Sequence, residues 1–363
     1  MKVPLTQIPV DNSIRRAVDR VLSSGQFVKG EENKRFEAEF ASYVGTRHAV
    51  AVSSGTAALQ LALQALGVRR SDEVLVPSFS FFATAAPLLH LGAKPVFVDI
   101  DPQTYTMDPE ATRRRITRQT KGMIPVHLYG HPADMKPLRE LALERDLWTL
   151  EDACQAHGSR YRSHSTGSLA NAAAFSFYPS KNMTVCGDGG MVTTNDSRLA
   201  ERVRMLSDGG RKTGEKYLHR LIGWNFRLSE LHAAIGREQL RHLEEWVDGR
   251  RRVANGYGER LGGMKQLALP VEMPWARHSY YVYPLRARRR SALVRHLNLS
   301  GVATGIYYPR PIHRQPAISG SRPSLPETDR AAREVLAIPM YPGLSDDDLD
   351  YVTAKVREFY REA

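Results

Sequence analysis

The first two-thirds of the chain alternate short apolar runs with longer stretches in which apolar residues recur at helical spacing. Apolar runs that stop at Gly, Pro or polar residues are typical of buried strands. Residues 57–66 and 134–145 have the period of helices. Strands that alternate with helices favour a mostly parallel sheet covered by helices. Seven strands are predicted, over residues 49–52, 73–76, 95–100, 123–128, 148–150, 173–178 and 191–194.

The pattern changes after about residue 240. Gly249 marks a possible break in the first helix of this region. We therefore predict an α/β protein with a large domain over residues 1–249, built on a seven-stranded, mostly parallel sheet, and a smaller α+β domain over residues 250–363. The elements expected in the second part are a long helix, a β-rich segment and a terminal helix that Ser345 caps, over residues 237–261, 280–285 and 346–361.

Composition places the chain among ordinary globular proteins, because 42% of its 363 residues are hydrophobic and 25% are charged. No run of about 18 uncharged apolar residues predicts a membrane span. Residues 1–11 do not show the pattern of a secretory signal. The two cysteines, Cys154 and Cys186, are too few for a disulfide framework. We expect a cytoplasmic protein without a membrane partner.

Basic residues outnumber acidic ones by 51 to 39, which gives a formal charge of +12. Arginine clusters occur at residues 113–115, 250–252 and 286–290. A nucleic-acid binder would concentrate this charge on one element and interleave aromatic residues. The clusters are spread along the chain, so we interpret them as solvated surfaces and expect no nucleic-acid partner. A DNA-binding regulator is the alternative from another functional class, and attraction of an anionic small substrate is a third interpretation.

Metal binding is not predicted. His127 and His131 are four residues apart, but Gly130 and Pro132 break any helix that could bring them together. Cys154 and His157 have a spacing seen in zinc sites, but the sequence lacks the second pair of ligands that such a site needs. Motifs for dinucleotides, Walker-type phosphate binding and serine hydrolysis are also missing.

Four polar segments stand out because each follows a run of strand character. In an open α/β sheet, ligands bind at the carboxyl ends of the strands, so the four segments are expected to converge. They comprise residues 53–56, 151–157, 176–182 and 223–227.

The first two segments each allow a functional and a structural interpretation. Residues 53–56 lie between a strand and a helix start, where free N–H groups and the helix dipole favour a phosphate. Alternatively, Ser54 or Thr56 simply caps the helix. Asp152 follows a strand and is costly to bury without a cationic partner such as a protonated pyridine nitrogen. Alternatively, it caps a turn.

The other two segments carry cationic side chains. Lys181 follows a β-rich run, and a partly desolvated lysine can form a Schiff base with an aldehyde. An isolated loop lysine can equally be solvated. Residues 223–227 combine aromatic, amide and guanidinium groups that suit an anion, or they pack at a helix start. An anion cradle, a carboxylate for a ring nitrogen and a Schiff-base lysine are together the parts that hold pyridoxal phosphate (PLP).

The order of the motifs resembles the DegT/DnrJ/EryC1/StrS family of sugar aminotransferases, which have the fold of PLP-dependent enzymes of fold type I. The likeness extends from about residue 25 to IYYPRPIHRQP and LAIPMYPGLS near the C-terminus, and so covers nearly the whole chain. The motifs between these ends are SSGTAALQLAL, DEVLVPSFSFFATA, GAKPVFVDI, IPVHLYGHPADM, EDACQAHG, FSFYPSKNMTVCGDGG and GWNFRLSELHAAIGR.

The resemblance implies roles for individual residues. Lys181 matches the lysine that carries the cofactor as a Schiff base and moves protons, and Asp152 matches the carboxylate on the pyridine nitrogen. Asn225 matches a phosphate ligand from the partner subunit, which implies a homodimer with shared active sites. The remaining positions that match cofactor contacts are Gly55, Thr56, Phe81, Gln155 and Ser176. Candidate substrate contacts are Lys29, Tyr308 and His313.

The resemblance also implies an activity. Relatives with histidine at the position of Lys181 remove a hydroxyl, so the lysine favours amino transfer. The family usually has glutamate at the position of Asp188, and aspartate is frequent there among relatives that aminate C3 of the sugar. Tyr307 stands where the family pattern has histidine. We expect a PLP-dependent aminotransferase that moves nitrogen from glutamate or glutamine to a nucleotide-linked 3- or 4-keto-deoxysugar, in amino-sugar, antibiotic or surface-glycan biosynthesis. A keto-cyclitol is the alternative acceptor.

Overall fold

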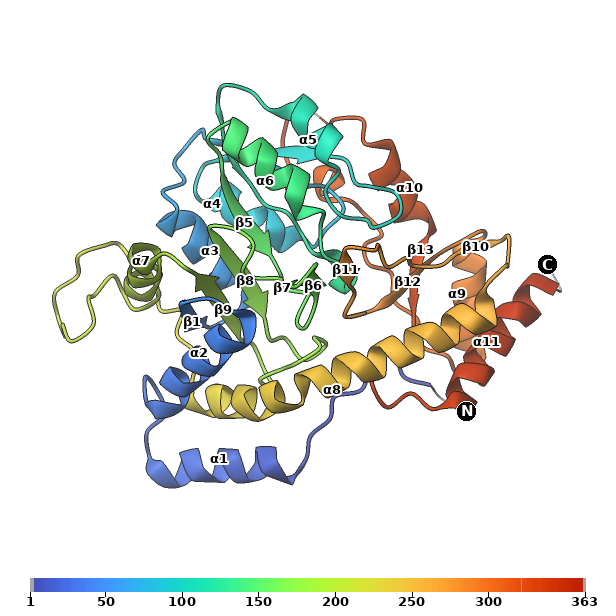
Figure 1. Ribbon diagram of the computed structural model, residues 1–363, viewed down its shortest axis with the longest axis horizontal. Helices are drawn as coiled ribbons and strands as arrows, with labels where there is room; N and C mark the ends of the chain where they lie inside the picture. The colour runs from blue at the N-terminus through green and yellow to red at the C-terminus, as the bar shows by residue number, and fades with distance from the viewer. Residues whose placement is uncertain (1–2, 321, 362–363) are drawn as a thin grey trace.

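A seven-stranded sheet forms the centre of the larger part of the molecule in the computed structural model, which describes residues 3–320 and 322–361 (Figure 1). Its strands are β1 (His48–Val52), β2 (Glu73–Pro77), β3 (Lys94–Val98), β4 (Thr120–Met123), β5 (Trp148–Asp152), β8 (Ala172–Ser176) and β9 (Gly190–Thr194). They lie in the order β1-β9-β8-β5-β4-β2-β3. Only β9 runs antiparallel to its neighbours, which confirms the predicted mostly parallel sheet.

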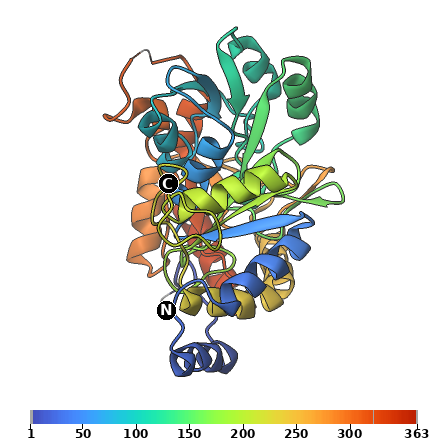
Figure 2. The same ribbon diagram turned by 90° about the vertical axis from the view of Figure 1, so that its left-hand side faces the viewer.

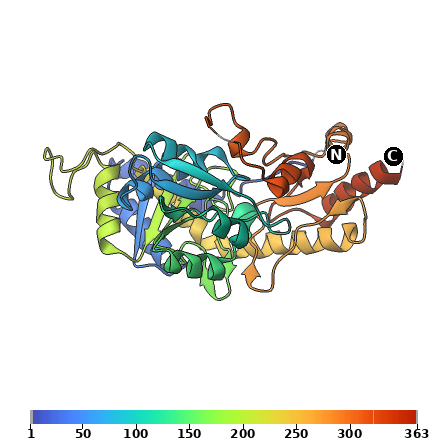
Figure 3. The ribbon, with the colours of Figure 1, turned by 90° about the horizontal axis from the view of Figure 1, so that it is seen from above.

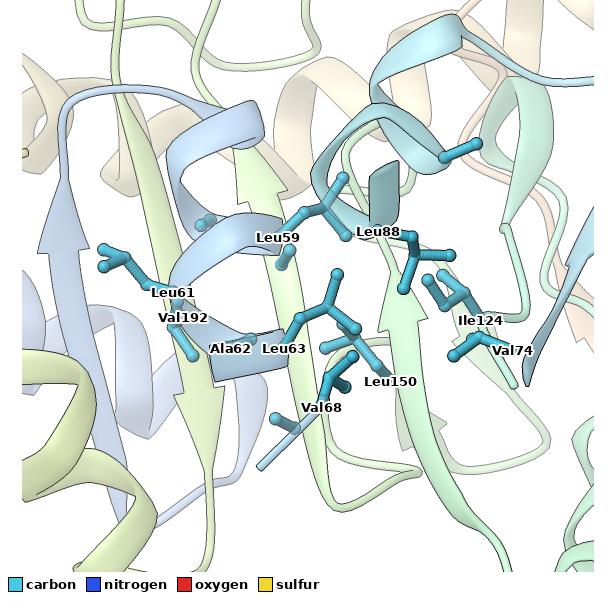
Figure 4. Packing of buried hydrophobic residues seen from close by; sticks show 14 of the residues in the cluster. Leu59, Leu61, Ala62, Leu63, Val68, Val74, Leu88, Ile124, Leu150 and Val192 are labelled. Carbon is cyan, nitrogen blue, oxygen red and sulfur yellow. The ribbon is translucent and has the colours of Figure 1, made fainter. Parts of the chain in front are cut away.

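Helices cover the sheet, as Figures 1 and 3 show. Helix α3 is mostly apolar and is largely buried. Figure 4 shows its Leu63 beside Leu150 of β5, and its Leu59 beside Leu88. Burial of each such leucine contributes about 1.5–3 kcal/mol. The helices of this part are α1 (Asn12–Ser24), α2 (Glu31–Val44), α3 (Gly55–Ala65), α4 (Ala86–His90), α5 (Pro109–Arg115), α6 (Met135–Glu144) and α7 (Ser197–Ser207).

Helix α8 (Glu230–Leu261) is longer than the predicted helix over 237–261 and has no break at Gly249. It begins earlier because the Ser229 hydroxyl caps it by accepting the His232 N–H at 3.2 Å. At Gly249 a Cβ atom would lie 3.0 Å from Pro342, so glycine here allows a close approach of two segments. Helices α1 and α2 pack against α8, and α1 lies at the bottom of Figures 1 and 2.

The C-terminal part contains a three-stranded sheet and three helices. The strands are β10 (Leu267–Ala268), β12 (Tyr283–Ala287) and β13 (Val335–Ile338), and the helices are α9 (Arg290–Leu299), α10 (Pro326–Glu334) and α11 (Asp346–Arg361). Ser345 accepts the Asp348 N–H at 3.1 Å, as its predicted capping role requires.

A second small sheet links the two parts, because β11 (Ala276–Arg277) pairs with β6 (Arg160–Tyr161), which also pairs with β7 (His164–Ser165). Helix α8 also passes through the predicted boundary near residue 250, which stays a prediction. Within residues 3–320 and 322–361, no helix is long and apolar enough to span a membrane.

Strand β5 ends in two carboxylates that point to opposite faces of the sheet, because successive side chains on a strand alternate. Glu151 is 0% exposed and accepts the N–H groups of Gly167 and Leu169 at 2.6 and 2.7 Å. His127 Nδ1 accepts the Ala133 N–H at 2.9 Å, so its Nε2 carries the proton and donates to Glu151 at 2.9 Å. This network accounts for the burial of Glu151 and His127.

Replacement of Glu151 tests this network. In Glu151→Gln an amide nitrogen takes the place of one acceptor oxygen, so at least one buried donor loses its partner. We expect the free energy of unfolding to fall by about 2–4 kcal/mol in urea denaturation. The control Glu140→Gln, at an exposed position of α6, should change it by less than about 0.5 kcal/mol. Equal stability of the two variants would contradict the role given to Glu151.

Candidate functional site

A cavity of about 490 Å³ lies at the carboxyl ends of β1, β2, β5 and β8. Three of the four polar segments singled out in the sequence meet there, as expected for the ends of parallel strands. The predicted site residues that line the cavity are Gly55, Thr56, Phe81, Asp152, Gln155, Ser176, Lys181 and Tyr308.

Asp152 is 5% exposed and is oriented by neutral groups. Its Oδ2 accepts the Thr84 hydroxyl at 2.8 Å, and its Oδ1 accepts the Cys154 N–H at 3.2 Å. Within residues 3–320 and 322–361, no cationic side chain forms an ion pair with this carboxylate. Burial, together with the nearby Asp152 charge, raises the pKa of the Cys154 thiol, which therefore stays protonated. The cavity wall thus carries a buried carboxylate that makes no ion pair with any described residue.

Lys181 reaches the same cavity from the loop after β8. Its backbone N–H donates to the Tyr178 carbonyl at 2.9 Å, and its side-chain Nζ lies 4.3 Å from the centre of the Tyr281 ring. An ammonium group at this distance from an aromatic face is held by cation–π attraction. Burial and the Lys181 charge lower the pKa of His157 to about 3, so this neighbouring imidazole stays neutral near pH 7. Lys181 is therefore positioned without a competing histidine cation.

The start of α3 forms another wall. Ser54 caps the helix by accepting the Ala57 N–H at 3.1 Å, so the capping interpretation holds for Ser54. Gly55 and Thr56 also line the cavity, and the first N–H groups of a helix have no intrahelical acceptors. A Cβ on Gly55 would lie 2.7 Å from the Cβ of Ser176, closer than packing allows. The segment therefore combines a helix cap with free N–H groups that suit a phosphate, and Gly55 allows its close packing against Ser176.

Gln155 connects the cavity to the C-terminal part of the chain. Its Oε1 accepts the Tyr129 N–H and its Nε2 donates to the Tyr308 hydroxyl, both at 2.9 Å. Tyr129 in turn donates its hydroxyl to the Tyr307 carbonyl. The Phe81 ring is 56% exposed and its centre lies 5.9 Å from that of Tyr308. One side of the cavity is therefore aromatic.

Sequence reasoning missed two residues of this site, Thr84 and Tyr281. Thr84 lies in the quoted segment DEVLVPSFSFFATA, but nothing in the sequence shows that its hydroxyl reaches Asp152. Tyr281 lies 100 positions after Lys181, in a segment predicted only as β-rich. Its contact with Lys181 depends on how the two parts of the chain pack together, which local patterns do not encode.

Three predicted contacts lie outside the cavity. Asn225 is exposed on the segment after α7, which extends from the left end of the molecule in Figures 1 and 3. Lys29 forms an ion pair with Asp208. His313 is 1% exposed, and its Nδ1 hydrogen-bonds the Ser78 hydroxyl at 2.6 Å. Within one chain, these side chains do not join the other candidate residues.

Asp208 holds the neighbourhood of Asn225 together. It also accepts hydrogen bonds from Arg211 and Arg227, both at 2.7 Å. Burial alone would raise the pKa of Asp208, but the hydrogen bonds from Lys29, Arg227 and Arg211 leave it below its ordinary value. The base of the projecting segment is thus fixed by a charged network.

The comparison with known protein families decides the family. Residues 9–357 match the DegT/DnrJ/EryC1/StrS aminotransferase family. The chain belongs to this family. It is 45% identical over 349 residues to the erythromycin biosynthesis sensory transduction protein EryC1 of Saccharopolyspora erythraea, with 95% of each chain covered. It is 44% identical over 346 residues to the dTDP-3-amino-3,4,6-trideoxy-alpha-D-glucose transaminase of Streptomyces venezuelae, covering 94% of this chain and 91% of that one.

Solved structures support the same family assignment. The crystal structure of S. venezuelae DesV in complex with a ketimine intermediate is similar, with a TM-score of 0.95 and 42% sequence identity, covering 99% of this chain and 98% of that one. The family is PLP-dependent, and this protein is an aminotransferase of the family. The cavity fits this cofactor, because it combines a lysine, a buried carboxylate that makes no ion pair with a described residue, and a helix start with free N–H groups.

Gly55→Ala tests the fit at the helix start. The added Cβ would also lie 2.9 Å from the Cys154 sulfur, so the start of α3 must shift. We expect the dissociation constant for PLP to rise about tenfold, measured from the cofactor retained after dialysis. The control is Gly258→Ala, where no atom lies within 4 Å of the added Cβ. Unchanged retention in Gly55→Ala would exclude this segment from the cofactor site.

Proposed function

We propose that this aminotransferase moves an amino group from glutamate or glutamine to a keto-sugar linked to a nucleotide. We rank a sugar with its ketone at C3 before one with its ketone at C4. The streptomycete relative, which is named for an amino group at C3 of a dTDP-sugar, supports the nucleotide-linked acceptor. Asp188, which lines the cavity, supports C3. The positive net charge of the chain suits a substrate with a diphosphate.

The observation that carries the proposal is the buried Asp152 carboxylate, which lacks a cationic partner in a cavity that also contains Lys181. An unpaired buried carboxylate is unfavourable, and a protonated pyridine nitrogen would stabilise it. Thr84 and the Cys154 N–H fix the orientation of the carboxylate without neutralising its charge. We therefore assign Asp152 to the ring nitrogen of PLP.

When bound, PLP supplies an electron sink that allows a carbon carrying an amino group to lose its proton. In this proposal Lys181 Nζ would hold the cofactor when no donor is bound, and the same amine would then accept and return that proton. Tyr281 holds the amine in the cavity when it is free. Gly55, Thr56 and Ser176 would hold the phosphate, and Phe81 would contact the ring of the cofactor.

A homodimer with shared active sites is the second part of the proposal. Asn225 lies outside the cavity of its own chain, on the segment that extends from the molecule. Large apolar side chains are exposed on the same segment, where contact with a second copy would bury them. They are Tyr217 (81% exposed), Leu218 (54%), Ile222 (96%) and Trp224 (42%). The position of Asn225 suits a ligand that reaches the cavity of a partner subunit.

Lys181→Ala tests the catalytic assignment. Without this amine we expect the absorption band of the lysine-linked cofactor to be replaced by that of the free aldehyde, and turnover to fall at least about a thousandfold. Circular dichroism should stay unchanged, because the variant removes only the end of a side chain at the cavity. Lys121→Ala, at an exposed position of β4, is the matched control and should keep both the band and the activity. Normal amino transfer by Lys181→Ala would refute the assignment.

A substrate panel tests the acceptor. The PLP-loaded enzyme is incubated with glutamate or glutamine and a 3-keto nucleotide-sugar, a 4-keto nucleotide-sugar or a keto-cyclitol, and products are detected by mass spectrometry. We expect kcat/KM for the 3-keto nucleotide-sugar to exceed the others by about tenfold or more, because the cavity must distinguish the position of a polar group. Preference for the free cyclitol would contradict the nucleotide-linked acceptor and leave the catalytic assignment intact.

A further inference from the structure

A second cavity, of about 840 Å³, lies in the C-terminal part between β10, β12, α9 and α10, which are labelled on the right of Figure 1. Among the described residues, no aromatic side chain lines it and its one acidic residue is Glu334. Its charge of +7 is more than half of the +12 of the chain. We name it the basic groove after its cationic residues, Lys265, Arg286, Arg288, Arg289, Arg290, Arg295, Arg330 and Arg333.

The groove is a feature that the sequence pattern does not show. The arginines at residues 286–290 are one of several separate clusters along the chain, and Arg288 and Arg289 are exposed. Folding brings them together with cations that lie far away in the sequence, such as Lys265 and Arg333. Charge that is spread along the chain is therefore concentrated at one place in the structure.

Few of these cations are neutralised. Arg330 lies 3.5 Å from both Glu327 and Glu334. Five further cations of the groove make no ion pair in the described part of the chain. They are Lys265, Arg286, Arg288, Arg295 and Arg333. Like charges at this density repel one another. An anion in the groove would relieve this repulsion.

The backbone adds to the positive potential. Helix α9 begins at Arg290 without a side-chain cap and without an acidic residue in its first turn, whereas α2, α8, α10 and α11 each have one there. The positive end of its dipole therefore faces cations, which is unfavourable unless an anion is present. Arg290 is also fixed in place, because its Nη1 donates to the carbonyls of Ala332 and Val335 at 2.5 and 3.3 Å.

We propose that the basic groove binds a small ligand with two or three linked phosphate groups. Guanidinium groups bind phosphate oxygens with two parallel hydrogen bonds, and several lie within one groove here. The volume is in the range of about 300–1,000 Å³ that is usual for small-molecule sites. Among the residues described, the groove offers no aromatic platform for bases, so its many guanidinium groups favour recognition of the phosphates. This site is separate from the Lys181 cavity and does not depend on the acceptor proposed above.

Calorimetric titration of the PLP-loaded enzyme with inorganic tripolyphosphate tests this proposal. The groove variant carries Arg288→Gln, Arg295→Gln and Arg333→Gln, at exposed positions without ion pairs. The control variant carries Arg114→Gln, Arg115→Gln and Arg118→Gln, which remove the same charge at exposed positions outside the groove. Both variants should keep amino transfer at the wild-type rate, because neither changes the Lys181 cavity.

We expect the wild type to bind one tripolyphosphate per chain, with affinity that falls between about 50 mM and about 200 mM salt. The groove variant should bind at least about tenfold more weakly, and the control variant should match the wild type. The proposal is overturned if the wild type does not bind or if both variants lose affinity equally. It is also overturned if duplex DNA binds the groove more tightly than tripolyphosphate, because the ligand would then be a nucleic acid.

Discussion

The alternation of side chains at the end of β5 is the constraint on which this structure depends. Glu151 and Asp152 are consecutive, so the pleat of the strand directs one carboxylate into the protein and the other into the cavity. Backbone N–H groups and His127 satisfy Glu151, whereas Asp152 receives only two neutral donors. A shift of one residue in this strand would exchange these environments and leave the cavity without its oriented charge.

The cavity also depends on chain segments that end at the same edge of the sheet. The start of α3, the end of β5 and the loop after β8 supply the helix start, the carboxylate and the lysine. These elements belong to the rigid core around α3, whose side chains pack as Figure 4 shows. A rigid support matters because an active site must hold its groups in position before substrate arrives.

Much of the large part could be predicted from the sequence, because its strands are short apolar runs and its helices have a clear period. Lys181 and Asp152 were identifiable because polar residues directly after strands meet at one sheet edge. Three features could not be predicted, for physical reasons. Gly249 has the composition of a helix break, but a close approach to Pro342 explains it. The contact between Tyr281 and Lys181 and the assembly of the basic groove both depend on tertiary packing.

The uninterrupted course of α8 limits how this enzyme can move. Tyr281, Tyr307 and Tyr308 reach the cavity from the C-terminal part, and the helix that joins both parts passes between them without a hinge. The pairing of β11 with β6 adds a second connection. Large rotation of one part against the other would require bending a helix of 32 residues. Two connections between the parts therefore favour substrate entry through the movement of loops and side chains over rotation of one part against the other.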